Sequence, residues 1–157
     1  MLHVVNGDLL NSNEQYIVHQ CNCVTTTAAY LAHAIFEKFP YSDVYSARVT
    51  NDTPGNILIR GDGKDQRYII ALFGQYFPGF PKYADSSKDG VKARQKYFHQ
   101  GLLKIAKIPS LQSVAFPYGI GCGAAGGNWD IYSRIIMNFA NYLNDKVEVY
   151  IYHLDGA

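Results

Sequence analysis

The residues best suited to hold a ligand form a glycine-rich segment at positions 116–129, with the sequence FPYGIGCGAAGGNW. It contains five of the chain's 14 glycines, all between positions 119 and 127. The segment follows the apolar run SVAF and precedes a pattern typical of a helix. Glycines allow an anion to approach the main chain, and a helix start adds unpaired N–H groups. The segment therefore indicates a phosphate-bearing ligand, or else a loop packed tightly beneath the next helix.

A second segment, HQCNCVTTTAAY at 19–30, also runs from an expected strand into an expected helix. Thr25, Thr26 and Thr27 are candidate caps for that helix. Two anion-binding loops would suit a diphosphate. The glycine-rich segment is not a P-loop, because no Gly-Lys-Ser/Thr follows, and a Rossmann glycine motif would follow the first strand.

A histidine and three cysteines near these segments offer other chemistry. His19 could act as an acid or base at neutral pH, or it could end a buried strand and bond a carbonyl. The spacing of His19, Cys21 and Cys23, together with Cys122, allows a zinc site, although small buried thiols are the ordinary alternative. A helix start could lower the pKa of Cys122 and make it a nucleophile, but the sequence identifies no base for it.

Strands are expected to alternate with helices along the chain, and the periodicity sets the bounds. We expect strands at 2–6, 16–20, 55–61, 67–74, 113–117 and 147–154, and helices at 27–39, 41–49, 89–107 and 129–144. Asp62-Gly63 predicts a hairpin between the third and fourth strands. The loop at 75–87 contains Tyr76, Phe77, Phe80 and Tyr83, which could cover a pocket or stack on a base.

This order of elements predicts a layered α/β protein, with helices on both faces of a sheet. In such folds, ligands bind beyond the carboxyl ends of the strands. The segments at 19–30 and 116–129 would both lie there. With 157 residues, we expect a single domain covering 1–157.

Composition excludes several classes of protein. Apolar residues make up 48% and charged residues 17%, which is typical of a globular protein. No apolar run approaches the roughly 20 residues of a membrane span, and the formal charge of +1 argues against general binding of nucleic acid. An odd number of cysteines and no apparent signal peptide favour a cytoplasmic protein with reduced thiols.

Three segments, taken in order, resemble a macrodomain, the module that binds ADP-ribose. VVNGDLL at 4–10 resembles the family's opening strand and its Gly-Asp-hydrophobic turn. IVHQCNCVTTTAAYLAHAIFEKFP at 17–40 resembles the segment in which an Asn precedes a loop and a helix. FPYGIGCGAAGGNW resembles the second glycine loop of a branch with an Ile-Gly-Cys-Gly motif. The resemblance covers nearly the whole chain and implies a three-layer α/β/α sandwich with a central mixed sheet.

The resemblance also implies roles for individual residues. Asp8 would bond the adenine amino group, Leu9 would contribute its backbone, and Asn22 would lie at the distal ribose. The two loops that wrap the diphosphate and distal ribose would comprise Ala28, Ala29 and Tyr30, and then Gly119, Ile120, Gly121, Cys122, Gly123 and Ala124. The family requires no metal and no cofactor.

The chain departs from the family at the reactive end. Ala28, Ala29 and Tyr30 replace a glycine run, and the Tyr30 side chain would either close off part of the pocket or turn outward as a wall. Relatives that remove ADP-ribose from glutamate or DNA use a Lys and an Asp. The Asp position holds Ala125 here, and Lys88 lies roughly where the Lys would be.

Two functional hypotheses follow from the resemblance. The protein could be a hydrolase of ADP-ribose derivatives, acting on ADP-ribose-1''-phosphate, acyl-ADP-ribose or ADP-ribosylated molecules through a water held near His19 and Asn22. It could instead be a non-catalytic module that recognises free or attached ADP-ribose. A Cys/His metal-binding protein is a third reading of the same residues. The expected partners are ADP-ribose or ADP-ribosylated molecules, with no membrane and no general nucleic-acid partner.

Overall fold

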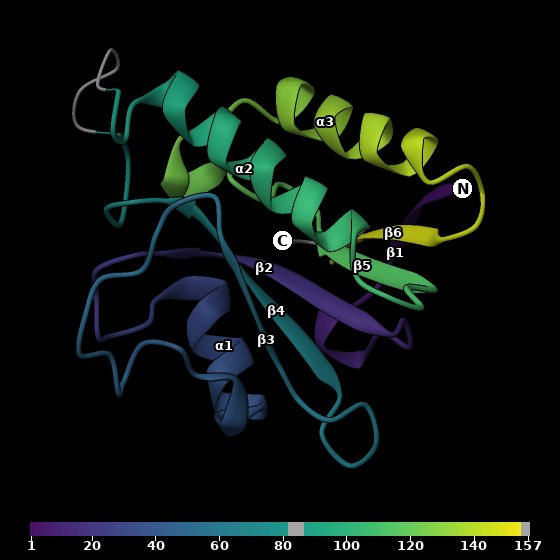
Figure 1. Ribbon diagram of the computed structural model, residues 1–157, viewed down its shortest axis with the longest axis horizontal. Coiled ribbons are helices and arrows are strands. Elements are labelled where there is room, and N and C mark those ends of the chain that lie inside the picture. The colour runs from purple at the N-terminus through teal and green to yellow at the C-terminus, as the bar shows by residue number, and fades with distance from the viewer. Residues whose placement is uncertain (82–86, 155–157) are drawn as a thin grey trace.

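A computed structural model describes residues 1–81 and 87–154, and its centre is a six-stranded mixed sheet (Figure 1). The strands are β1 (Leu2–Asn6), β2 (Tyr16–Asn22), β3 (Ile57–Arg60), β4 (Tyr68–Gln75), β5 (Ser113–Pro117) and β6 (Glu148–His153). They lie in the order β1-β6-β5-β2-β4-β3. Only β3 and β4 pair antiparallel, so the expected hairpin is confirmed.

Helices cover both faces of this sheet, which confirms the three-layer α/β/α arrangement. Helices α2 (Val91–Ala106) and α3 (Trp129–Tyr142) lie side by side on one face, and α1 (Tyr30–Lys38) lies on the other (Figure 1). None of the helices in the described part of the chain is both long and apolar enough to cross a membrane.

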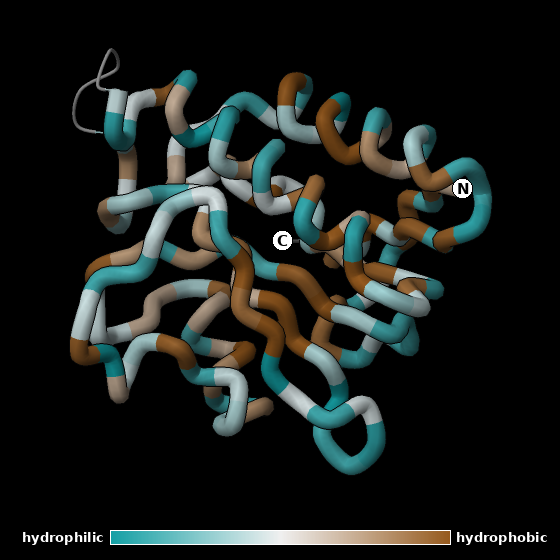
Figure 2. Tube along the Cα trace, viewed as in Figure 1, coloured by the Kyte–Doolittle hydropathy of each residue, from teal (hydrophilic) through white to brown (hydrophobic). Residues whose placement is uncertain are grey.

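The core has two halves because side chains alternate across the strands. On β4, Ile70 and Leu72 pack beneath α2 and α3, whereas Ile69, Ala71 and Phe73 pack against the α1 side. Hydrophobic residues, in brown, are accordingly concentrated in the central strands in Figure 2. A strand buried on both faces is typical of a sheet with helices on either side.

The parallel pairing brings the two predicted ligand segments to the same edge of the sheet. Strands β2 and β5 are parallel neighbours, with Tyr16 opposite Val114. Their carboxyl ends therefore face the same way, and the chain leaves them at Asn22 and Pro117. The segments that follow these strands become neighbours, although about 95 residues separate them in the sequence.

The helix expected at 41–49 is wrong. A short 3-10 helix spans Pro40–Ser42, and the chain then continues through bends and turns. The Asp43 carboxylate accepts hydrogen bonds from the backbone N–H groups of Tyr45 and Ser46. Such local bonds offer the backbone an alternative to the helical ladder, which the periodicity of the apolar residues does not reveal.

Candidate functional site

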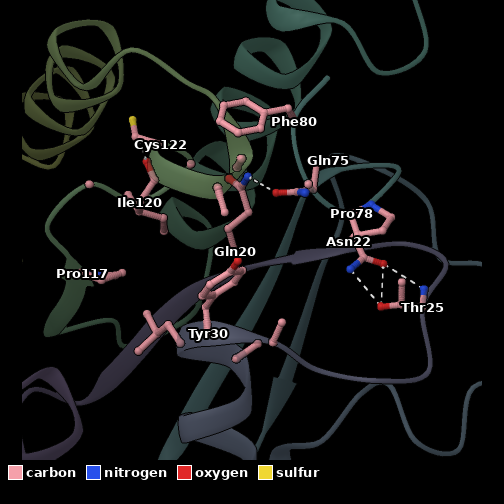
Figure 3. A pocket seen from close by; sticks show the side chains of 18 of the residues that line it. Gln20, Asn22, Thr25, Tyr30, Gln75, Pro78, Phe80, Pro117, Ile120 and Cys122 are labelled. Carbon is pink, nitrogen blue, oxygen red and sulfur yellow. Dashed lines mark hydrogen bonds between the residues drawn. The ribbon is translucent and has the colours of Figure 1, made fainter. Parts of the chain in front are cut away.

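A cleft of about 750 Å³ opens at the carboxyl edge of the sheet, between the start of α1 and the glycine-rich segment (Figure 3). Its volume is in the range of small-molecule sites. The residues that line it are Gln20, Asn22, Thr25, Thr27, Ala29, Tyr30, Leu31, Ala32, Tyr45, Gln75, Pro78, Gly79, Phe80, Pro117, Tyr118, Gly119, Ile120, Gly121, Cys122, Ala124 and Ala125.

The glycines of the glycine-rich segment at 116–129 have two different structural roles. At Gly121, an added Cβ would lie 2.3 Å from the Tyr132 ring, and at Gly127 it would lie 2.3 Å from the Gly121 carbonyl oxygen. These glycines permit tight packing under α3. At Gly119, which lines the cleft with a φ of +79°, an added Cβ would meet nothing within 4 Å. The expectation of a tightly packed loop is therefore confirmed at Gly121 and Gly127, and the phosphate ligand stays a prediction.

Backbone donors in this segment remain available to a ligand. The N–H groups of Gly119, Gly121 and Ala124 have no acceptor among residues 1–81 and 87–154. The intervening N–H groups close the local turns, since Ile120 donates to Pro117 and Cys122 donates to Gly119. The cleft thus has three free donors on one side, all belonging to residues that line it.

The start of α1 supplies donors on the opposite side. The helix begins at Tyr30, and its N-cap Ala29 makes no side-chain cap bond. The N–H groups of Tyr30, Leu31 and Ala32 therefore have no acceptor in the described chain, as expected at a helix start. The prediction that Thr25, Thr26 or Thr27 caps this helix is wrong, because the helix starts three residues later than expected.

Asn22 is buried at the end of β2 and lines the cleft, where its amide holds the turn that follows. Its Oδ1 accepts from the N–H groups of Val24 and Thr25, at 3.0 and 2.9 Å. Its Nδ2 donates to the hydroxyl of Thr25 (Figure 3) and to that of Tyr45. These bonds make Asn22 a support for the shape of the cleft wall.

The buried side chain of Arg94 links two walls of the cleft. Its guanidinium is 2% exposed and pairs with Asp89, at 2.6 Å between Nη2 and Oδ2. Its Nη1 donates to the carbonyl oxygens of Gly79 and Ala125, at 2.6 and 3.0 Å. One buried side chain on α2 therefore joins the loop after β4 to the glycine-rich segment.

Tyr30 lies at the mouth of the cleft with a φ of +55° and a side chain that is 82% exposed. Of the two orientations that the sequence left open, the ring turns outward as a wall and does not fill the pocket. Phe80 is also at the mouth and is 67% exposed. Of the other aromatic residues expected to cover the pocket, Tyr76 and Phe77 do not line it, and Tyr83 is outside the described residues.

The structure does not bring His19 to the cleft. Its ring is 1% exposed and packs edge-on against Phe36, with the centroids 5.4 Å apart. Burial lowers the pKa of the His19 imidazole to about 4, so the ring is neutral at pH 7. Its nitrogens lie 3.6 and 3.7 Å from the Cys21 sulfur. The alternative is confirmed in that His19 lies in a buried strand, but the residue is within β2 and not at its end, and its ring bonds no carbonyl in the described residues.

The cysteines form no metal centre in the described residues, where no group of three His, Cys, Asp or Glu side chains could hold an ion. The Cys23 thiol donates to the Gln75 carbonyl, at 3.4 Å. Burial raises the pKa of the Cys23 thiol to about 12 and that of Cys122 to about 11. Cys122 lines the cleft, but as a protonated thiol and a poor nucleophile at neutral pH.

Four other predicted ligand residues do not line the cleft. Asp8 accepts a hydrogen bond from the Leu10 N–H and begins a 3-10 turn in which Leu9 is buried. Ala28 and Gly123 flank lining residues without lining the cleft themselves. Asp8, Leu9, Ala28 and Gly123 therefore stay predictions for ligand contact.

Lys88 and Ala125, at the positions of the Lys and Asp of other branches, do not both line the cleft. Ala125 lines the cleft and has no ionisable side chain. The ammonium of Lys88 lies 4.0 Å from the centroid of the Tyr76 ring, and Lys88 does not line the cleft.

Sequence reasoning missed the polar floor of the cleft. The Gln20 side chain donates to the Gln75 amide oxygen at 2.7 Å, and both line the cleft (Figure 3). Gln20 lies two residues before Asn22 on β2, and alternation puts both on the same face. That spacing could have found Gln20. Gln75 could be placed only by the pairing of β4 with β2.

Comparisons with known proteins identify the fold. No family model matches the chain, and no curated protein matches its sequence. Among solved structures, it is similar to the macrodomain of Mycobacterium tuberculosis DarG, with a TM-score of 0.75 and 21% identity over 97% of both chains. The macrodomain of Thermus aquaticus DarG gives 0.73 and 23% over 97% of both chains.

A mutant macrodomain of Oceanobacillus iheyensis, solved with ADPR, gives a TM-score of 0.69 and 17% identity, over 99% of this chain and 86% of the other. The present chain therefore has the macrodomain fold, as its sequence motifs implied.

We expect Arg94→Leu to lower the free energy of unfolding by about 3–5 kcal/mol, because it leaves the Asp89 carboxylate buried without its charge partner. Urea unfolding measures the change. Arg134→Leu, on an exposed position of α3, is the control and should stay within about 0.5 kcal/mol. A loss for Arg94→Leu no larger than that of the control would contradict the role of this ion pair.

We expect Cys122 to be alkylated slowly at pH 7, because its raised pKa keeps the thiolate scarce. Its rate with iodoacetamide should rise about tenfold per pH unit until the pH approaches its pKa. Mass spectrometry of the folded protein gives the rate, and the urea-unfolded protein, with all three cysteines accessible, is the control. A rate that levels off below pH 9 would show that burial does not raise this pKa.

Proposed function

We propose that the cleft binds ADP-ribose, free or attached to another molecule, with the diphosphate between its two sets of backbone donors. The observation that carries this proposal is the placement of those donors. Three free N–H groups of the glycine-rich segment and three at the start of α1 belong to residues that line one cleft. Two facing sets of donors suit the two phosphates of a diphosphate.

The electrostatics of the cleft suit an anion held by the main chain. None of its described lining residues is Lys, Arg, His, Asp or Glu. The positive end of the α1 dipole and the free N–H groups would oppose the ligand's charge, with no acidic side chain among the lining residues to repel it. Glycine at 119 leaves room for a phosphate to approach the backbone.

The proposed direction of the ligand follows from the ends of the cleft. Tyr118 lines one end and stacks on His153, with the ring centroids 4.1 Å apart. The Gly7 N–H donates to the His153 carbonyl, which brings Asp8 toward this end. The adenine would lie here, near Asp8, and the distal ribose would lie toward Asn22 and Gln75.

Among the activities that the resemblance implies, binding is the one that the geometry supports best. The ionisable groups of the described lining are Tyr30, Tyr45, Tyr118 and Cys122. Burial raises the pKa of both Tyr45 and Cys122, so each keeps its proton at neutral pH. The lining thus favours recognition over a hydrolysis that needs a side-chain base, and we propose a reader of ADP-ribose.

Calorimetric titration of ADP-ribose tests this function, with AMP and ADP as partial ligands. We expect micromolar binding of ADP-ribose and weaker binding of AMP, which lacks the second phosphate and the distal ribose. No heat at millimolar ADP-ribose would contradict the proposal. Steady release of phosphate from ADP-ribose-1''-phosphate, or of ADP-ribose from modified protein, would replace the reader with a hydrolase.

Gly119→Val should weaken ADP-ribose binding at least tenfold, because the new side chain would occupy open space beside a free N–H group. The change also strains the backbone, since φ there is +79°. Asn144→Val is the matched control, because Asn144 has a φ of +53° in the turn after α3 and does not line the cleft. Both variants should lose stability, but only Gly119→Val should lose affinity. Equal affinities by calorimetry would place the diphosphate elsewhere.

A further inference from the structure

We propose that Tyr30 and Phe80 form an aromatic clasp that closes on the distal ribose and makes the cleft prefer ADP-ribose to ADP. This inference rests on the proposed function, because the clasp acts on a ligand whose diphosphate lies between the two loops. It assigns a specificity role to two side chains on opposite walls of the cleft.

The backbone of Tyr30 is strained for no evident internal gain. Its φ of +55° is a conformation that glycine adopts freely and that a bulky residue adopts at a cost. The ring is 82% exposed, and its hydroxyl has no hydrogen-bond partner in the described chain. The ring therefore gains little from packing within the protein, and its surface is available to a ligand.

Tyr30 stands at the edge of the cleft, among the residues that line it. It is the first residue of α1, and its own N–H is one of the free donors. Figure 3 shows the Tyr30 ring on the α1 side, with Gln20 between it and the glycine-rich segment. A ligand bound to the N–H groups of α1 would therefore pass directly beside the ring.

Phe80 occupies the opposite side of the cleft mouth. An added Cβ at Gly126 would lie 2.6 Å from Phe80 Cδ1, so the ring rests on the glycine-rich segment. Arg94 holds the preceding residue, Gly79, through its carbonyl oxygen. Phe80 is thus anchored at its base, while 67% of its side chain stays exposed.

Two exposed aromatic rings can gain free energy by burying their surface on a ligand. A diphosphate offers them little apolar surface, whereas a ribose offers the carbon face of its ring. The distal ribose would extend from the diphosphate toward Gln75 and Pro78, on the wall that leads to Phe80. ADP ends at the second phosphate and would leave the clasp empty.

The test compares ADP-ribose and ADP on four variants, by calorimetry for affinity and stopped-flow fluorescence for dissociation. Tyr30→Asn removes the ring and retains a residue that tolerates a positive φ. Phe80→Ala removes the opposite ring. Tyr30→Phe retains the ring without its hydroxyl, and Tyr142→Asn removes an exposed aromatic ring at the end of α3, outside the cleft.

We expect Tyr30→Asn and Phe80→Ala each to bind ADP-ribose about tenfold more weakly, mainly through faster dissociation. Their affinity for ADP should stay within about twofold of the wild type, since ADP lacks the group that the rings contact. Tyr30→Phe and Tyr142→Asn should match the wild type with both ligands. The urea midpoint of Tyr30→Asn should be no lower than that of the wild type. Weaker binding would then reflect the missing contact with the ligand and not a less stable fold.

The outcomes separate this inference from the function on which it rests. If the wild type binds ADP-ribose and the two ring-removing variants bind it equally well, the clasp is overturned and the proposed function stands. Equal losses for ADP and ADP-ribose would overturn the assignment to the distal ribose. A wild type that binds neither ligand would overturn the proposed function, and the clasp with it.

Discussion

The buried ion pair between Arg94 and Asp89 is the constraint on which the cleft depends. Removing both charges from water is costly, and their attraction offsets that cost only when the remaining donors and acceptors are also satisfied. Here the Asp89 carboxylate also accepts from the N–H groups of Tyr76 and Phe77. The guanidinium donates to the carbonyl oxygens of Phe77, Gly79 and Ala125. Satisfying one pair therefore joins the loop after β4, the start of α2 and the glycine-rich segment.

This arrangement leaves the ligand to the backbone. Charged side chains are used beneath the cleft, where they orient loops, and none is found among its described lining residues. Arg48 acts in the same way, because it donates to the carbonyl oxygens of Asn22 and Thr25 and pairs with Asp52. A site made of main-chain N–H groups needs such supports, since its donors are only as well placed as the loops that carry them.

The glycine-rich wall of the cleft is closely packed, whereas the backbone at Tyr30 is strained. Gly121 and Gly127 pack against neighbours so closely that a side chain at either position would force the loop to move, whereas Gly119 borders open space. Tyr30 carries a bulky side chain on a backbone suited to glycine. Non-glycine residues in such conformations are concentrated at functional sites, where the surrounding structure holds them. The floor and the glycine wall are thus fixed by packing, whereas the rings of Tyr30 and Phe80 are exposed at the mouth.

The sequence alone determined the strands, the three long helices and the position of the glycine-rich segment, because these depend on periodicity and on the local chemistry of glycine and proline. It also implied the macrodomain fold through three short motifs. It could not determine that Asp43 diverts 41–49 from a helix, or that α1 begins at Tyr30 without a side-chain cap. The first of these outcomes depends on local hydrogen bonds that compete with propensity.

Only the tertiary structure decided which residues share the cleft. His19 and Asn22 lie three residues apart in the sequence, yet the sheet buries the His19 ring beneath α1 and leaves the Asn22 side chain in the cleft wall. Gln75, Phe80 and Ala125 reach the same site through strand pairing and through Arg94, which the sequence does not announce. The physical reason is that contacts across a sheet depend on register and burial, and these are properties of the assembled layers.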